Sequence, residues 1–433
     1  MQEILFDYKI NPTTWAYLSA LLMIGIYFKF HRFWCVRNLD LIALICVSPG
    51  LLLVYYGLAN HAVGQVQAGF LWLFAISGFF LIRLLIDPIM VRRPLLDPNL
   101  SVSGLAFTGA ALLVFLLANI VKNPPDRLES YLGKQQTPAQ ANPGLTMFYQ
   151  FAGFSSKAII HNDDTQPEIY RKLEIQVASA RTTAILAHLA VVIGMVLVGY
   201  RHFDNIRTGV AAATLYLLIF PTSQFTGQVD HVVPAALLVW AIVAYRHPLA
   251  SGLLMGIVLS LIYYPWFLLP LWFGFYLRKG SLRFLLGVLA ALAIIVIPMA
   301  LKAGSWDVFW PQLSIMLGIR NPLDVHASGF WQFHEDVFRL PVMVAYGALC
   351  CSLALWPPQK NLGTLLSCSA AVMLGSQFWH ANDGGLYIAW YMPLLILTIF
   401  RPNLEDRVAL SAVRDMRRLW RKNRLPKTQA SAL

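Results

Sequence analysis

The chain has 433 residues, of which 58% are hydrophobic and 12% are charged, and its mean hydropathy is +0.60. Soluble globular domains carry about 25% charged residues, so the composition excludes this class and indicates an all-α polytopic membrane protein. A net charge of +12 would suit a nucleic-acid partner. However, when the apolar stretches are placed across a bilayer in chain order, most of the 33 Lys and Arg fall on one side of the membrane. This asymmetry indicates orientation by the positive-inside rule and argues against nucleic-acid binding.

Apolar stretches close to the length that crosses about 30 Å of hydrocarbon recur along the whole chain. The predicted spans are residues 13–30, 39–58, 67–86, 101–121, 181–200, 282–301, 341–356, 363–378 and 386–400, with shorter stretches at 207–221 and 230–245. Together with a long apolar block at 249–277 they predict about 11–13 transmembrane helices. The spans contain almost no ionisable side chain apart from His188.

The block 249–277 is interrupted at Tyr263-Tyr264-Pro265-Trp266 and has basic residues on both flanks, Arg246 before it and Arg278 after it. Because both flanks favour the inner side, we expect two half-length helices that meet near Pro265 at the outer side. Backbone groups that lose their helical hydrogen bonds at this depth must be buried in protein or line a cavity, so a cavity is expected there. The alternative is one Pro-kinked helix, which would reverse the orientation of everything downstream.

Two long extracytoplasmic loops are predicted at about 122–180 and 302–340, and the first ends in a helix at 166–180. Residues 1–400 form one polytopic transmembrane domain, while 401–433 form a basic amphipathic tail that suits an anionic inner leaflet. We therefore expect a multi-pass protein of a bacterial inner (plasma) membrane with a cytoplasmic C-terminus.

Several polar clusters face the predicted outer side. The candidate site residues are Asp126, Asp163, Asp164, Gln228, Asp230, His231, Lys302, Arg320 and His326. A carboxylate at a membrane exit can act as general base towards a hydroxyl, and basic side chains can take up the charge of a departing phosphate. The simpler alternative is that the acidic clusters are solvated turns, in which Asn and Asp satisfy local backbone groups. Gln228, Asp230 and His231 are harder to explain in this way, because polar groups beside a short apolar helix usually face an interior cavity.

A family resemblance rests on four short runs within residues 181–280. They are Ile219-Phe-Pro221, Thr226-Gly227-Gln228-Val-Asp230, His247-Pro248-Leu-Ala-Ser-Gly252-Leu-Leu-Met-Gly256 and Tyr264-Pro265-Trp-Phe-Leu-Leu-Pro270-Leu-Trp272. This pattern resembles the polyprenyl-phosphate-sugar-dependent glycosyltransferases of the GT-C superfamily, most closely the bacterial α-mannosyltransferase-like branch. The resemblance implies a GT-C-like fold, a catalytic acid in the first extracytoplasmic loop and a lipid-phosphate sugar donor. Asp126 and the pair Asp163 and Asp164 fall in the matching loop, although three spans precede the helix that enters this loop, whereas the family usually starts with that helix.

The leading hypothesis is a membrane glycosyltransferase (a hexosyltransferase) that moves a sugar such as mannose from a polyprenyl-phosphate donor to an acceptor hydroxyl on the outer face. Asp126, or Asp163 or Asp164, would be the base. Lys302, Arg320 and His326 would hold the phosphate, and Gln228, Asp230 and His231 would line the donor cavity.

The alternatives are a transporter or flippase of a lipid-linked or anionic solute and a non-catalytic membrane scaffold. The expected partners are the lipid-linked sugar and membrane lipids. No metal site is predicted, and a divalent cation, like the oligomeric state, is left open.

Overall fold

The computed structural model describes residues 11–90, 97–122, 168–319, 327–358 and 360–402. These residues form 15 α-helices joined by short 3-10 turns, and no β-strand occurs among them. Many large apolar side chains on the outside of the bundle are exposed, among them Leu301 (79%) and Phe107 (78%). An exposed apolar surface of this extent fits contact with lipid tails. The chain is therefore an all-α, multi-pass membrane protein, as the composition predicts.

Four helices of the described residues precede the first long loop. They are α2 (Pro12–Tyr27), α3 (Val36–Ala59), α4 (Val63–Ile86) and α5 (Val102–Lys122). Helices α3 and α4 form a tight antiparallel pair, because glycines let their backbones approach. A Cβ added at Gly69 would lie only 2.8 Å from the backbone nitrogen of Val54.

Six helices follow in the middle of the chain. They are α8 (Glu168–His202), α9 (Ile206–Leu218), α10 (Phe220–Gln224), α11 (Val229–Val243), α12 (Pro248–Leu261) and α13 (Leu269–Tyr276). The helix expected at 166–180 and the span expected at 181–200 are one continuous helix, α8, whose 35 residues reach about 52 Å. The helix expected at the end of the first outer loop is thus present and continues directly into the next candidate span, Val177–His202.

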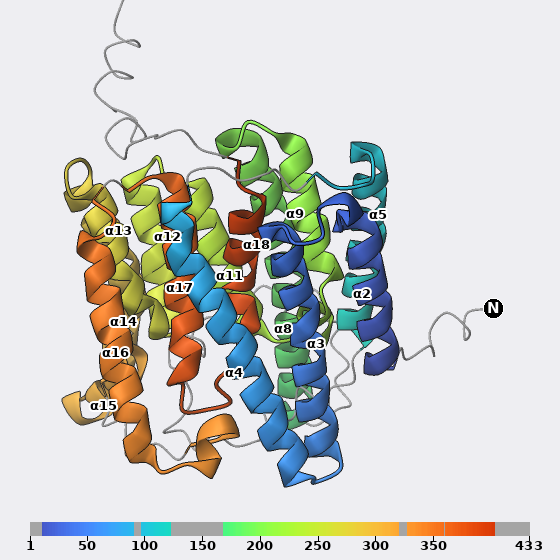
Figure 1. The fold of residues 1–433 in the computed structure, drawn as a ribbon. Coiled ribbons are helices and arrows are strands. Elements are labelled where there is room, and N and C mark those ends of the chain that lie inside the picture. Colours follow the sequence, from blue (N-terminus) through green and yellow to red (C-terminus); the bar gives the residue numbers. More distant parts are fainter. Residues whose placement is uncertain (1–10, 91–96, 123–167, 320–326, 359, 403–433) are drawn as a thin grey trace, which may run out of the picture.

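The last five helices are α14 (Ser281–Ala303), α15 (Trp306–Leu317), α16 (Arg339–Leu355), α17 (Leu362–Gly375) and α18 (Met392–Phe400). Every residue of α17 and α18 is buried, and Figure 1 shows both helices in the middle of the bundle. The span expected at 386–400 is α-helical only from Met392, because turns and a 3-10 turn at Ile388–Trp390 precede it. The second long loop, predicted at 302–340, contains a helix, α15.

Six helices of the described part are long and apolar enough to cross a membrane, fewer than the 11–13 expected. They cover Val36–Ala59, Val63–Ile89, Val102–Val121, Val177–His202, Ser281–Ala303 and Asp336–Leu355. Four shorter apolar helices accompany them, at Ile206–Leu218, Val229–Val243, Pro248–Leu261 and Leu362–Phe378. A helix of 14 residues such as α12 reaches only about 21 Å. Helices of this length are too short to cross about 30 Å of hydrocarbon on their own.

The block 249–277 turns back on itself, as its flanking charges predict. It consists of α12, a 3-10 turn at Tyr264–Leu268 and α13. The Tyr276 hydroxyl donates a hydrogen bond to the carbonyl of Tyr245, just before α12. Beyond α13, Gly280 has a φ of 101° and packs so closely on Pro248 that a Cβ would come within 2.7 Å of its ring. Both ends of the block thus lie together at the predicted inner end of the bundle.

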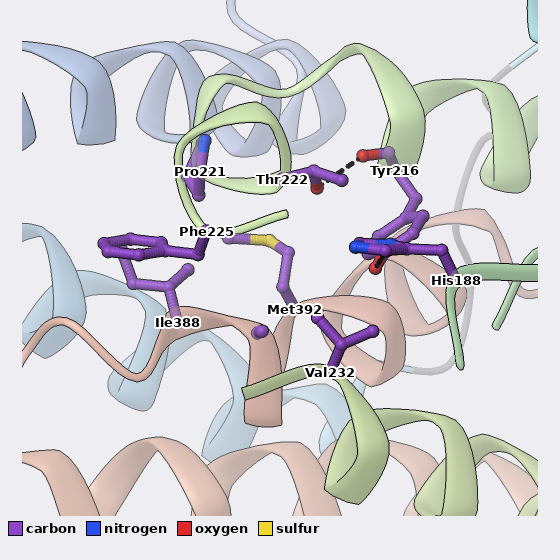
Figure 2. Close-up of a pocket in the computed structure, with 9 residues that line it drawn as sticks. His188, Tyr216, Pro221, Thr222, Phe225, Val232, Ile388 and Met392 are labelled. Carbon is purple, nitrogen blue, oxygen red and sulfur yellow. Dashed lines mark hydrogen bonds between the residues drawn. The ribbon is translucent and has the colours of Figure 1, made fainter. Parts of the chain in front are cut away.

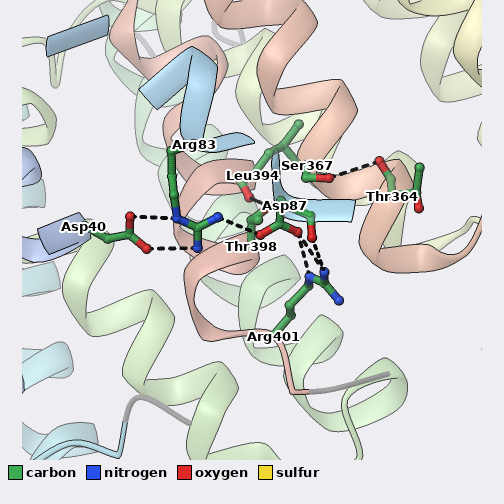
Figure 3. A network of polar contacts seen from close by, with 8 residues as sticks. All are labelled: Asp40, Arg83, Asp87, Thr364, Ser367, Leu394, Thr398 and Arg401. Atoms are coloured by element: carbon green, nitrogen blue, oxygen red, sulfur yellow. Dashed lines mark hydrogen bonds and ion pairs between the residues drawn. The ribbon is translucent and has the colours of Figure 1, made fainter. Parts of the chain in front are cut away.

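A buried ionic network at the predicted inner end corrects the expectation that the spans hold almost no ionisable group besides His188. Arg83 of α4 binds both carboxylate oxygens of Asp40 in α3, at 3.0 and 3.1 Å. Asp87 accepts hydrogen bonds from Arg83 at 2.9 Å and from Arg401 at 2.7 Å (Figure 3). Asp40 and Asp87 are fully buried. Opposite charges and several hydrogen bonds offset the cost of burying these groups, and they tie α3, α4 and the end of α18 together.

Candidate functional site

Three segments, made of turns, 3-10 turns and the five-residue helix α10, interrupt the short helices and meet inside the bundle. They are residues 219–228 between α9 and α11, residues 262–268 between α12 and α13, and residues 376–391 between α17 and α18. The indole nitrogen of Trp390 in the third segment donates to the carbonyl of Asp230, next to the first, at 2.9 Å. Irregular backbone at membrane depth is tolerated where it is buried or lines a cavity. The meeting point of the three interruptions is therefore the candidate site.

A column of six stacked rings runs through this meeting point. From one end to the other its members are Phe225, His231, Tyr387, His380, Tyr264 and Tyr263. Successive ring centroids are 5.1, 4.5, 4.5, 4.5 and 4.1 Å apart, and the ring planes are inclined by 20–30°. Each of the three interruptions or its flank supplies two rings, and such contacts stabilise beyond the area that they bury. The column thus fixes the three segments relative to one another.

His380 is electrically neutral within the column. Its Nδ1 accepts a hydrogen bond from the backbone N–H of Asn382 at 3.1 Å, which places the proton on Nε2. Burial lowers the pKa of this imidazole, and the positive charge of Arg339 lowers the pKa further, to about 3. A neutral ring can stack on tyrosines without the cost of burying a charge.

Buried polar atoms without a partner gather at the start of α11. Among the described residues, no hydrogen bond reaches Thr226 Oγ1, Gln228 Oε1, Asp230 Oδ1 or His231 Nδ1. Buried polar groups in native proteins nearly always have a partner, either within the protein or in water or a ligand. Four such atoms within six consecutive residues indicate a place where a polar ligand or water binds.

His188 of α8 contacts this segment and holds it in position. Its Nε2 meets the carbonyl of Thr226 at 3.1 Å, so it carries the proton, and its Nδ1 accepts from the Tyr216 hydroxyl at 3.0 Å. A small cavity with room for about one water molecule lies beside this pair (Figure 2). Its other lining residues are Pro221, Thr222, Phe225, Val232, Ile388, Ala389 and Met392. The cavity is too small for a sugar, so its effect on the site is through positioning.

The structure brings together three of the nine predicted site residues, Gln228, Asp230 and His231. Lys302 lies apart from them in sequence, exposed in the last turn of α14. The other five fall outside the described residues: Asp126, Asp163, Asp164, Arg320 and His326.

The residues that flank the segment 320–326 do reach the ring column. A Cβ at Gly318 would come within 2.6 Å of the Tyr263 ring, and the N–H of Ser328 donates to the carbonyl of Ala381 at 2.9 Å.

The candidate site residues predicted from the sequence do not include three residues of this region, His380, Tyr387 and Arg339, although the run 377–383 is expected on the same outer face. The first two lie between short apolar stretches, and Arg339 directly precedes an apolar span, which is the available signal for a buried polar group. Arg339 is 3% exposed, donates to the carbonyl of Trp379 at 3.3 Å and pairs with Asp336 at 3.7 Å. It is a buried cation beside the column.

The arrangement offers polar groups, one buried cation and stacked rings within an apolar bundle. Within the described ranges, no three His, Cys, Asp or Glu side chains are grouped so that they could share a metal ion.

No protein-family model, no curated protein and no solved structure matches the chain.

Proposed function

We propose that the protein transfers a sugar from a polyprenyl-phosphate donor to an acceptor hydroxyl at the outer face of the membrane. The observation that carries this proposal is the group of unpartnered buried atoms of Thr226, Gln228, Asp230 and His231 inside an apolar bundle. A lipid-linked sugar combines a hydroxyl-rich head with an apolar tail, and it is the class of ligand that would meet such polar atoms from within a bilayer. The resemblance to GT-C glycosyltransferases adds support.

The proposed reaction needs a base and a stabiliser of the leaving phosphate. A carboxylate takes the proton of the acceptor hydroxyl, whose oxygen forms a bond to the anomeric carbon as the bond from that carbon to the phosphate oxygen breaks. The electron pair of the broken bond leaves with the polyprenyl phosphate, and nearby cations lower the energy of the developing charge. Asp126, or Asp163 or Asp164, is the proposed base. Arg320, His326 and Lys302 are the proposed phosphate contacts.

The outer surface of the bundle suits a lipid donor. Helix α14, which precedes the second long loop, exposes large apolar side chains along its length, including Leu282 (68%), Ile294 (65%) and Leu301 (79%). A polyprenyl tail would dissolve in the lipid beside such a helix while its head reaches the interior. A soluble nucleotide-sugar donor has no apolar tail that would contact this surface.

The test is transfer by purified protein in lipid nanodiscs, with polyprenyl phosphates that carry radiolabelled mannose, glucose or galactose and a membrane extract as acceptor. We expect one donor to label the acceptor and to release polyprenyl phosphate in equal amount. Absence of transfer from all three donors, with protein that is folded by thermal melting, would contradict the proposal for hexosyl donors.

A second candidate is a transporter or flippase, which the interrupted helices favour. Discontinuous helices at mid-depth commonly form the binding sites of secondary transporters. In that case the protein would move a lipid-linked sugar across liposome membranes without any acceptor. Movement that persists after removal of Asp126, Asp163 and Asp164 would favour transport, whereas loss of labelling in these variants favours transfer.

A further inference from the structure

The unpartnered atoms at the start of α11 are mainly hydrogen-bond acceptors. Gln228 Oε1 and the Asp230 carboxylate can only accept, while Thr226 Oγ1 and His231 Nδ1 can adapt to either role. Thr226 is 1% exposed and His231 is 5% exposed, so bulk solvent does not satisfy them. A ligand that fits here must bring donors.

A phosphate group would not satisfy this set of atoms. A phosphate diester at neutral pH offers acceptors and negative charge, which the Asp230 carboxylate would repel in surroundings of low dielectric constant. Sugar hydroxyls each carry a donor and can satisfy Gln228 and Asp230 at the same time. The chemistry of the segment thus selects the sugar and rejects the phosphate.

Charged groups lie at different points along the ring column. Asp230 directly precedes His231, near the Phe225 end. Arg339 donates to the carbonyl of Trp379, whose ring centroid lies 5.1 Å from that of Tyr264, near the Tyr263 end. Arg339 also pairs with the partly exposed Asp336 at 3.7 Å. A sugar phosphate is therefore accommodated better with its sugar towards Asp230 and its phosphate towards Arg339.

We propose that the segment Thr226–His231 is the sugar-binding subsite, which takes the hydroxyl groups of a neutral hexose, and that the donor phosphate lies towards the Arg339 end of the ring column. This inference rests on the proposed function for the identity of the donor, but it requires binding alone and not transfer.

The experiment compares the binding of two lipids to protein in nanodiscs: polyprenyl phosphate that carries a hexose, and the same polyprenyl phosphate without sugar. Mannose, glucose and galactose are tried as the hexose. The variants are Asp230→Asn, which removes the charge, and Gln228→Met, which removes the acceptor at similar length. Asp204→Asn is the matched control, because Asp204 is exposed and lies in the turn between α8 and α9. Melting temperatures establish that each variant is folded.

We expect each site variant to weaken the binding of one hexose-bearing lipid by about tenfold or more, the usual effect of losing a hydrogen bond to a charged or buried group. Binding of the sugar-free lipid should change less than twofold, and Asp204→Asn should change neither. Equal losses for both lipids, no loss for either, or no saturable binding of any hexose-bearing lipid by wild type would overturn the inference. So would Mg²⁺ binding that depends on Asp230 without any discrimination between the lipids.

The two proposals can fail separately. If wild type binds the hexose-bearing lipid through Asp230 and Gln228 but transfers nothing, the sugar subsite stands and the transferase fails. If transfer proceeds with an unchanged KM for the donor in both variants, the subsite fails and the transferase stands.

Discussion

The imidazole of His231 stacks on the phenol ring of Tyr387 with the ring centroids 4.5 Å apart and the planes inclined by 30°. One residue lies in the first turn of α11 and the other in the connection that precedes α18. This contact joins the segment with unpartnered acceptors to the third interruption. Both rings belong to the ring column, which holds the three interruptions together at one site.

Removing the hydroxyl of Tyr216 should loosen the first interruption. In Tyr216→Phe, the buried Nδ1 of His188 loses its donor, which should lower the free energy of unfolding by about 1–3 kcal/mol. Tyr200→Phe is the control, since Tyr200 is 60% exposed on the same helix as His188 and should change stability by less than about 0.5 kcal/mol. Denaturant unfolding in detergent measures both. Equal stability of the two variants would mean that the contact between His188 and Tyr216 contributes nothing.

The ionic network at the predicted inner end should depend on Asp87. Asp87→Asn leaves Arg401 and Arg83 without the shared carboxylate, which should cost about 3–5 kcal/mol of stability. The matched control is Asp97→Asn, because Asp97 is 65% exposed and its pair with Arg207, at 3.5 Å, should contribute at most about 1 kcal/mol. Melting curves of the purified variants compare them. A similar small effect at both positions would show that the buried network is not what holds α3, α4 and α18 together.

The turn-back of the block 249–277 can be tested at Gly280. In Gly280→Ala the methyl group meets Pro248 at a φ of 101°, so the variant should lose about 1–3 kcal/mol of stability. Gly347→Ala, in α16, places its methyl group where no atom lies within 4 Å, and should be neutral or stabilising by up to about 1 kcal/mol. If both variants melt alike, the ends of the block do not pack as described.

Acid should destabilise the ring column through His380. Its pKa in the folded protein is lowered to about 3, below the value of about 6.5 expected when unfolded, so the unfolded state binds a proton first. The contribution of His380 to the free energy of unfolding is at its full value above about pH 7. It decreases as the pH drops below about 6.5, by up to about 1.4 kcal/mol per pH unit. Melting temperatures of wild type and His380→Gln at pH 7.5 and 5.5 check this. The variant should lose less on acidification, and an equal loss would contradict a neutral buried His380.

The sequence predicted the parts of the fold that depend on local composition. The all-α membrane class and the turn near Pro265 follow from hydropathy and from basic residues on both flanks, and the structure confirms both. Of the roughly 11–13 transmembrane helices expected, six in the described residues are long and apolar enough to cross a membrane and others are shorter, because apolar runs do not reveal where a helix ends. Helix α8 was divided in the prediction since its first half is polar, although the backbone continues without a break.

The contacts between distant segments could not be predicted from one sequence. Gln228, Asp230 and His231 were identified because polar residues beside a short apolar helix are costly. Their partners in the ring column come from segments far along the chain, and no spacing rule links Tyr264 or Tyr387 to His231. Asp40, Arg83 and Asp87 lie at the ends of predicted spans, and only the packing of α3 against α4 brings them together.

The most direct test of the central claim is the rate of sugar transfer from the polyprenyl-phosphate hexose that wild type accepts, measured for wild type, Asp126→Asn and the double variant Asp163→Asn/Asp164→Asn. The account predicts that one of these variants loses about 10²-fold to 10⁴-fold in rate while it still binds the donor. Full activity in both variants, or no transfer by folded wild type from any hexosyl donor, would contradict it.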